Sequence, residues 1–314
     1  MSQTVFQGLL VPVLTPFRSD LSADAEAFLR HCRWLLAQGA DGLAVFGTTS
    51  EANSLGIEER MVLLEYLLDN GIPASVLMPG TGTSALADTV RLTAHAVSHG
   101  CSGVLMLPPF YYKDVSDDGL FASYANVIER IGDAALKIYL YHIPPIAQVG
   151  ISLDLIGRLL RDYADTVVGL KDSSGDWQHT IAILKEYPAL ATFCGSEVFL
   201  LETLRNGGAG SITATGNTNP AGIRKIFEHW QEPDAASMQK HITSIRRAFE
   251  GYALIPALKA VAANYYDAPE WYTVRPPLRA LCETEVTALM SRLGQLEFSM
   301  TSMPSASGAS ANDA

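Results

Sequence analysis

The sequence predicts an α/β fold, a (β/α)8 TIM barrel that carries a C-terminal helical extension. Three observations predict it. Short apolar runs recur about every 20–34 residues, roughly the length of one strand plus one returning helix. Segments with helical periodicity lie between these runs. After about residue 230 the alternation stops, and three helical patterns follow one another.

The apolar runs are rich in Val, Ile and Leu, as buried parallel strands are. Eight of them predict strands, at residues 9–15, 42–46, 74–78, 103–108, 137–143, 167–171, 191–194 and 210–213. Eight strand–helix units in series are the number that closes a barrel. An open doubly wound sheet is the alternative, but it places a glycine-rich phosphate turn after the first strand. Residues 15–18 read TPFR, and the GTGT at 80–83 comes too late, so the barrel is favoured.

The chain divides into three parts. Residues 1–229 are expected to form the barrel, and residues 230–300 a region of three helices. These helices are predicted over 234–249, 254–265 and 275–298, with breaks at Gly251 and at residues 267–269. The last residues, 301–314, are small and polar without periodicity, so we expect them to be disordered.

The composition excludes several classes of function. The formal net charge is −11 and the pI is 5.1, so the surface repels a phosphate backbone and nucleic-acid binding is not expected. No apolar stretch reaches the roughly 18 residues of a membrane helix, and the N-terminal residues lack the basic start of a signal peptide. The cysteines are scattered without metal-ligand spacing, which indicates reduced thiols in a cytoplasmic protein; they are Cys32, Cys101, Cys194 and Cys282.

In barrels of this kind the active site lies at the carboxyl ends of the strands. Lys171, one of seven lysines, closes the apolar run 167–171. A lysine partly withdrawn from water loses its proton more readily, which frees the lone pair that attacks a carbonyl group. The alternative is an ordinary strand-end lysine that reaches water or pairs with Asp172.

Two further strand ends carry hydroxyl groups. Tyr141 closes the neighbouring strand, where its phenol is a suitable proton shuttle, although a tyrosine that caps the core is equally consistent with the pattern. Thr48 and Thr49 follow Gly47 in a turn whose hydroxyl and backbone N–H groups can hold a carboxylate. Ordinary helix capping is the alternative for this turn.

Metal and hydrolase chemistry have weaker support. His95 and His99 have the i,i+4 spacing of a metal pair, but they fall on an outer helix without an HExxH motif, so no metal site is expected. Neither a GxSxG motif nor a P-loop occurs. An amine, a phenol and a carboxylate-binding turn suit Schiff-base formation with a 2-oxo acid, in which the imine acts as the electron sink. No metal or organic cofactor is then expected.

Three motifs give the chain a family resemblance. The segments GTTSE (47–51), YHIP (141–144) and GLKDS (169–173) have the order and spacing seen in the dihydrodipicolinate synthase/N-acetylneuraminate lyase family, over about residues 5–298. The resemblance implies a (β/α)8 barrel that is usually a homotetramer, a dimer of dimers, acting on pyruvate-type 2-oxo acids and aldehydes. It also implies an imine on Lys171 and proton transfer by Tyr141.

The same resemblance assigns further site residues. Thr48 and Thr49 bind the carboxylate or relay protons, and Thr49 and Tyr111 are counted with the catalytic residues. Tyr111 matches a tyrosine that crosses a subunit interface, although Tyr112 beside it leaves the register open. Ile212 matches a pocket residue against the pyruvyl group, and Gly195 completes the expected substrate-binding residues.

Two departures from the family pattern bear on the substrate. Ser50 stands where many members have glycine, and residues 145–149, PIAQV, hold no arginine. Dihydrodipicolinate synthases resemble one another in having an arginine there, and a bidentate guanidinium is not replaced by Pro, Ile or Gln. We therefore expect a lyase, a class I aldolase acting on a 2-oxo-3-deoxy sugar acid or a related 2-oxo acid. The alternatives are 4-hydroxy-tetrahydrodipicolinate synthase, a 2-oxo acid dehydratase, and a non-catalytic barrel that binds 2-oxo acids.

Overall fold

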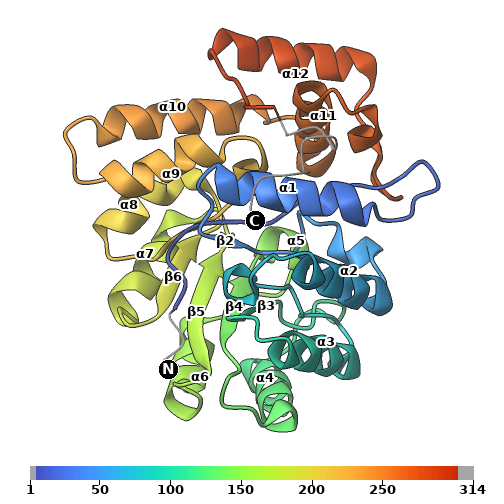
Figure 1. Ribbon diagram of the computed structural model, residues 1–314. Coiled ribbons are helices and arrows are strands. Elements are labelled where there is room, and N and C mark those ends of the chain that lie inside the picture. The colour runs from blue at the N-terminus through green and yellow to red at the C-terminus, as the bar shows by residue number, and fades with distance from the viewer. Residues whose placement is uncertain (1–4, 303–314) are drawn as a thin grey trace, which may run out of the picture.

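The computed structural model describes residues 5–302 and shows a curled sheet of seven parallel strands surrounded by helices (Figure 1). The strand order is β2-β1-β7-β6-β5-β4-β3. The strands are β1 (Gly8–Val11), β2 (Gly42–Leu43), β3 (Val104–Met106), β4 (Ile138–His142), β5 (Val167–Asp172), β6 (Ala191–Cys194) and β7 (Gly210–Ile212). Most are shorter than the apolar runs that predict them, but β6 matches its run and β5 extends one residue beyond its run. β1 stops directly before Pro12, which has no N–H to donate to a ladder.

Helices return the chain between the strands. The helices are α1 (Ala25–Ala37), α2 (Ile57–Asp69), α3 (Leu86–Ser98), α4 (Asp117–Ile131), α5 (Pro144–Ala147), α6 (Leu153–Asp162), α7 (Trp177–Glu186), α8 (Leu200–Arg205), α9 (Pro220–His229), α10 (Ala235–Ala248), α11 (Leu254–Tyr266) and α12 (Glu283–Gln295). Figure 1 shows α10, α11 and α12 together at one end of the molecule. Short 3-10 segments lie at 52–54, 74–76, 197–199, 214–217 and 269–272.

The predicted strand over residues 74–78 is wrong in its position. Ala74–Val76 forms a 3-10 turn, because Pro73 sets the backbone for a turn and its carbonyl accepts from the Val76 N–H. The strand-like hydrogen bonds come slightly later. The Met78 N–H donates to the Leu43 carbonyl, and the Leu105 N–H donates to the Pro79 carbonyl, so this segment bridges the two edge strands of the sheet.

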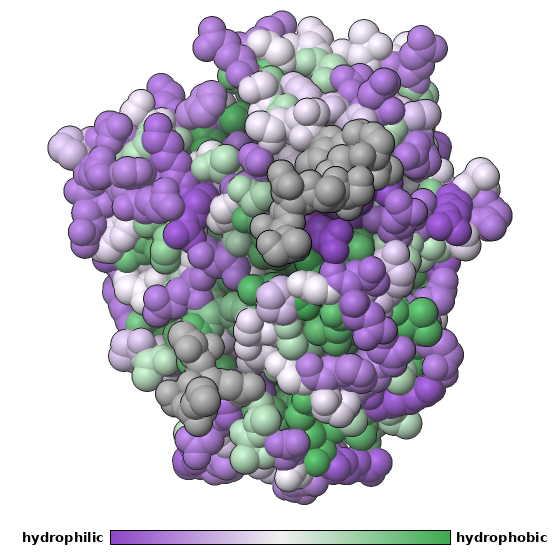
Figure 2. Space-filling view, in the orientation of Figure 1, coloured by the Kyte–Doolittle hydropathy of each residue, from purple (hydrophilic) through white to green (hydrophobic). Residues whose placement is uncertain are grey.

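Alternate residues of the strands form two separate cores. Those that point to the inside of the curled sheet include Leu10, Leu105, Tyr139, Phe193 and Ile212. Their neighbours along each strand pack outward against the amphipathic helices. Hydrophilic side chains cover much of the face seen in Figure 2, as expected where the polar sides of such helices meet water.

A third core joins the C-terminal helices, and it includes Leu258, Trp271 and Leu289. The predicted helices at 234–249 and 254–265 correspond to α10 and α11. The predicted helix at 275–298 is wrong in its first part, because α12 begins only at Glu283. Pro276 and Pro277 cannot donate backbone hydrogen bonds and hold residues 275–282 out of a helix.

Three other expectations concern the C-terminal tail, membrane-spanning helices and the cysteines. The predicted disordered tail, 301–314, lies outside the described residues except for its first two. Within residues 5–302, no helix is both long and apolar enough to span a bilayer. All four cysteines carry free thiols, and three of them are buried.

Candidate active site

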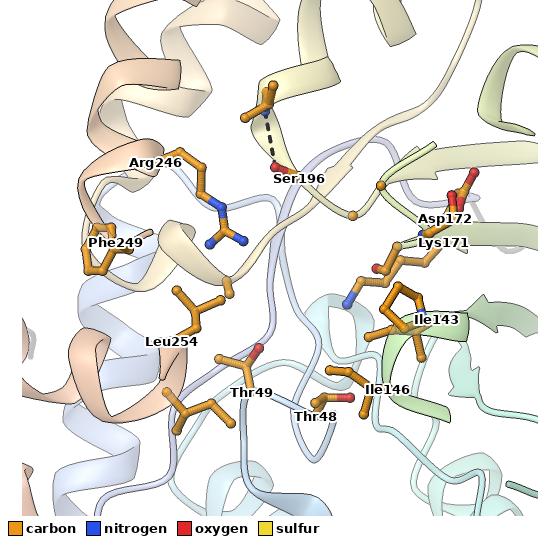
Figure 3. A pocket seen from close by; sticks show the side chains of 18 of the residues that line it. Thr48, Thr49, Ile143, Ile146, Lys171, Asp172, Ser196, Arg246, Phe249 and Leu254 are labelled. Carbon is orange, nitrogen blue, oxygen red and sulfur yellow. Dashed lines mark hydrogen bonds between the residues drawn. The ribbon is translucent and has the colours of Figure 1, made fainter. Parts of the chain in front are cut away.

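A cavity of about 670 Å³ opens at the carboxyl ends of β4, β5 and β6 (Figure 3). It is lined by five residues that the sequence analysis selected: Thr48, Thr49, Tyr141, Lys171 and Gly195. The opposite wall comes from α10, from α11 and from the loop between them. Residues from four strand ends therefore meet residues from the C-terminal helices around one space.

Lys171 and Tyr141 lie side by side because β4 and β5 pair in register there. Their side chains are 4% and 3% exposed, so both project from the strands into the protein rather than into bulk water. The Lys171 Nζ lies 4.1 Å from the centre of the Tyr141 ring. A primary amine and a phenol are thus held together at the base of the cavity.

The turn after β2 brings a hydroxyl group to the same place. The Thr48 Oγ1 lies 3.3 Å from the Tyr141 phenol oxygen. The Ser50 hydroxyl accepts a hydrogen bond from the Gly47 N–H at 3.3 Å. Ser50 therefore stabilises the turn itself, and its side chain does not line the cavity.

A buried ion pair secures this turn to the C-terminal helices. Glu51 has a left-handed backbone (φ 55°), and its Oε1 lies 2.5 Å from the Nζ of Lys259 on α11. Its Oε2 accepts from the Arg275 N–H at 3.0 Å. Burial lowers the pKa of Lys259 to about 8, although Glu51 opposes that shift. The ion pair thus links the turn of Thr48 and Thr49 to a helix distant in sequence.

Asp172, next to Lys171, points to the other face of β5 toward α7. Its carboxylate accepts from Thr180 Oγ1 at 2.7 Å and from the Ser174 N–H at 2.9 Å, and it lies 3.0 Å from His179 Nδ1. Burial would raise the pKa of Asp172, but these hydrogen bonds hold it below its usual range. Lys171 therefore does not depend on Asp172 as its partner, which removes one alternative for this lysine.

Two histidines extend this network behind the strands. His142 stacks on His179 at 4.2 Å between ring centres, and its Nδ1 accepts from the Ile151 N–H at 2.9 Å. Burial lowers the pKa of His142 to about 4. The side chains of His142, Asp172 and His179 place possible metal-ligand atoms close together. The hydrogen bonds described above already engage the Asp172 carboxylate and the His142 Nδ1. The arrangement holds the carboxyl ends of β4 and β5 in place.

The remaining predicted residues lie in different surroundings. Gly195 lines the cavity, and a Cβ there would be 2.0 Å from Ser173 Oγ, so only glycine fits. Ile212 is fully buried in the inner core and does not line the cavity. Tyr111 is 74% exposed in this single chain and also lies outside the cavity lining. His95 on α3 pairs with Glu65 on α2 at 2.8 Å and does not line the cavity.

The sequence analysis did not identify the opposite wall. Arg246 from α10, Phe249 directly after α10 and Leu254 from α11 line the cavity across from Lys171 (Figure 3). A weak signal was present, because Arg246 follows Ile245 and precedes Ala248 on an otherwise apolar helix face. Only the packing of α10 over the sheet shows that this side chain faces the strand ends.

Comparisons with known proteins place the chain among its relatives. A sequence model of the Dihydrodipicolinate synthetase family matches residues 5–296. The chain belongs to this family. It is 35% identical over 285 residues to an "Uncharacterized DapA-like lyase" of Chloroflexus aurantiacus, covering 90% of this chain and 94% of that protein.

Crystal structures of dihydrodipicolinate synthetase family members have the same fold. Dihydrodipicolinate synthase from Agrobacterium tumefaciens is 32% identical, with a TM-score of 0.86 over 92% of this chain and 99% of that one. YagE of Escherichia coli K12, in complex with pyruvate, is 25% identical with a TM-score of 0.85, covering 94% and 100% of the two chains. As a member of this family, the protein is a lyase.

Proposed function

We propose that the protein is a class I aldolase in which Lys171 forms a Schiff base with pyruvate or a related 2-oxo acid. The observation that carries this proposal is the buried Lys171 amine beside the Tyr141 phenol, with Thr48 within hydrogen-bonding reach of that phenol. The crystal structure of YagE contains pyruvate, and that protein shares the fold over nearly all of this chain.

The reaction follows from these groups. The Lys171 nitrogen forms a bond to C2, and the carbonyl oxygen gains protons and leaves as water, so that a protonated imine remains. The C3–C4 bond then breaks, its electron pair moves into the imine to give an enamine, and the C4 hydroxyl loses its proton to give the aldehyde. The enamine carbon takes up a proton, and water hydrolyses the imine. Tyr141 shuttles these protons, with Thr48 as the next hydroxyl.

A 2-oxo-3-deoxy sugar acid is the substrate class that we propose. Pro145 and Ile146 line the cavity at the segment where the synthases are expected to have arginine, and neither side chain can pair with a second carboxylate. This favours the aldolase over 4-hydroxy-tetrahydrodipicolinate synthase. Product analysis with aspartate semialdehyde distinguishes the two reactions.

Three further features belong to the proposal. The reaction needs no metal or organic cofactor, because the imine on Lys171 is the electron sink. The curled sheet acts as a closed eight-stranded barrel, with residues 78–81 as the remaining strand. The enzyme is a cytoplasmic homotetramer, and the exposed pair Tyr111 and Tyr112, 74% and 71% accessible and packed edge to face, is suited to a subunit interface.

Borohydride reduction with pyruvate tests the proposal. A stable adduct is expected on Lys171, detected by peptide mass spectrometry. Lys171→Ala and Lys171→Arg should both abolish it, since a guanidinium stays protonated and is no nucleophile. Lys185→Ala, which removes an exposed lysine from α7, is the matched control. An unmodified Lys171 would refute the mechanism, and stabilisation by pyruvate without an adduct would favour a non-catalytic binding protein.

A further inference from the structure

Arg246 is a cation without a described role at the far end of the cavity. Its Nη1 is buried, and no residue within 5–302 accepts a hydrogen bond from it. Figure 3 shows the guanidinium directed into the cavity, on the side opposite the Lys171 amine. A buried hydrogen-bond donor without an acceptor destabilises the protein. A ligand that supplies an acceptor there removes this penalty and therefore binds more tightly.

The surroundings of Arg246 define the charge that this end accepts. Phe249 and Leu254 present apolar surface beside it, and Glu250 also lines the cavity. A phosphate dianion carries two charges and three acceptor oxygens, more than one guanidinium satisfies. One planar guanidinium matches one carboxylate, through two parallel hydrogen bonds and a single compensating charge.

The two ends of the cavity have different tasks. At the strand ends, the turn of Thr48 and Thr49 is assigned to the carboxylate of the 2-oxo acid, and Lys171 to its C2 carbon. Arg246 is held on α10, across the cavity, so it meets the opposite end of a substrate that is bound to Lys171. A volume of about 670 Å³ accommodates a chain of sugar-acid length between them.

We propose that Arg246 binds a carboxylate at the far end of the aldehyde half of the substrate. The substrate is then a 2-oxo-3-deoxy sugar diacid, which is cleaved to pyruvate and an aldehyde that carries its own carboxylate. This inference rests on the proposed Schiff-base function and narrows its substrate class. It also accounts for the lack of arginine at 145–149, because the cation for the second substrate comes from another element.

A matched substrate pair tests the assignment. The six-carbon 2-oxo-3-deoxy diacid and the corresponding monoacid, which ends in a CH2OH group, differ only at the last carbon. We expect the wild-type kcat/KM to be at least about 10-fold higher for the diacid. Arg246→Met should abolish this preference and so lower the diacid-to-monoacid ratio of kcat/KM by about 10-fold or more, because a buried charge pair loses one partner. Arg246→Lys should recover part of that ratio.

Arg247→Met is the control, since it removes an exposed arginine from the same helix and should leave the ratio unchanged. Equal kcat/KM for the two acids in the wild type would overturn the inference, even if Arg246→Met fails to fold. A preference for the 6-phosphorylated monoacid over the diacid would also overturn it. Borohydride trapping of pyruvate on wild-type Lys171 distinguishes failure of the Schiff-base function from failure of the Arg246 assignment. If the adduct forms but the diacid is not preferred, only the role of Arg246 is refuted.

Discussion

Tyr141 has contacts on both sides that a structural tyrosine would not need. Its ring faces the Lys171 amine, and its hydroxyl lies 3.3 Å from Thr48 Oγ1. Tyr139, two residues earlier on β4, is equally buried, but its hydroxyl accepts from the Phe6 N–H at 2.9 Å. The contacts of Tyr141 therefore suit proton transfer, whereas those of Tyr139 suit a structural role.

Tyr141→Phe should lower kcat by about 100-fold, because the variant keeps the ring and loses the proton-carrying hydroxyl. The free energy of unfolding should change by less than about 1 kcal/mol. Steady-state kinetics with the preferred 2-oxo acid and urea denaturation measure the two quantities.

Tyr139→Phe should show the opposite pattern. It leaves the buried Phe6 N–H without its acceptor and should cost about 1–3 kcal/mol of stability with little change in kcat. An unchanged kcat in Tyr141→Phe would remove that residue from the mechanism.

Sequence analysis reached Lys171, Tyr141 and Thr48 because a polar side chain at the end of an apolar run is unusual in itself. Arg246 gives only a weak signal, since an arginine on an amphipathic surface helix is ordinary. Ile212 is another residue whose position the sequence does not predict. An isoleucine is suited to a pocket wall or to a core, and only the tertiary structure places it in the inner core.

At the scale of elements, the turn after β2 depends on α11. Lys259 is fully buried and contacts Glu51, the Thr273 carbonyl and the ring of Phe17. Removing one member of a buried pair leaves the other charge without compensation. The position of Thr48 and Thr49 is therefore coupled to a helix about 200 residues away in the sequence.

Lys259→Met should lower the free energy of unfolding by about 3–5 kcal/mol and raise the KM for the 2-oxo acid. The double variant Glu51→Gln with Lys259→Met should recover part of the stability, because no unpaired charge remains. Urea denaturation and steady-state kinetics give both values. Lys240→Met, at an exposed position on α10, is the control, and a loss below about 1 kcal/mol in Lys259→Met would contradict the prediction.

Sequence patterns predicted α10 and α11 more accurately than the third strand. The periodicity of α10 and α11 placed both within a residue or so, since an amphipathic stripe extends over several turns. Residues 74–78 are apolar, but Pro73 starts a turn and shifts the pairing to residues 78–81. Backbone pairing depends on neighbouring strands, which no local pattern contains.

For the whole molecule, two buried histidines make stability depend on pH. Burial lowers the pKa of both His31 and His142 to about 4. In the unfolded chain each has a pKa near 6.5, so below that pH the unfolded state takes up protons that the folded state excludes. Stability is therefore lost as the pH falls from about 6.5 to about 4. His179 opposes this trend, because its hydrogen bond with Asp172 raises its pKa.

His31→Gln isolates one of these contributions. We expect the slope of unfolding free energy against pH to fall by about one proton per molecule between pH 6 and 5. The neutral glutamine can still approach Asn217 and Tyr266, the two partners of His31. Urea denaturation across that range measures the slope. His241→Gln, at an exposed position, should leave it unchanged, and an unaltered slope in His31→Gln would contradict the assignment.

Local sequence patterns were sufficient to predict the α/β alternation, the amine and phenol at neighbouring strand ends, and the acidic character of the surface. These features are local, because each follows from the period of apolar residues or from one polar residue that interrupts it. Tertiary structure alone decided the far wall of the cavity, the ion pair of Glu51 with Lys259 and the bridging of the sheet edges by residues 78–81. Each of these joins segments far apart in the chain, and their contact depends on how helices pack over the sheet rather than on any local pattern.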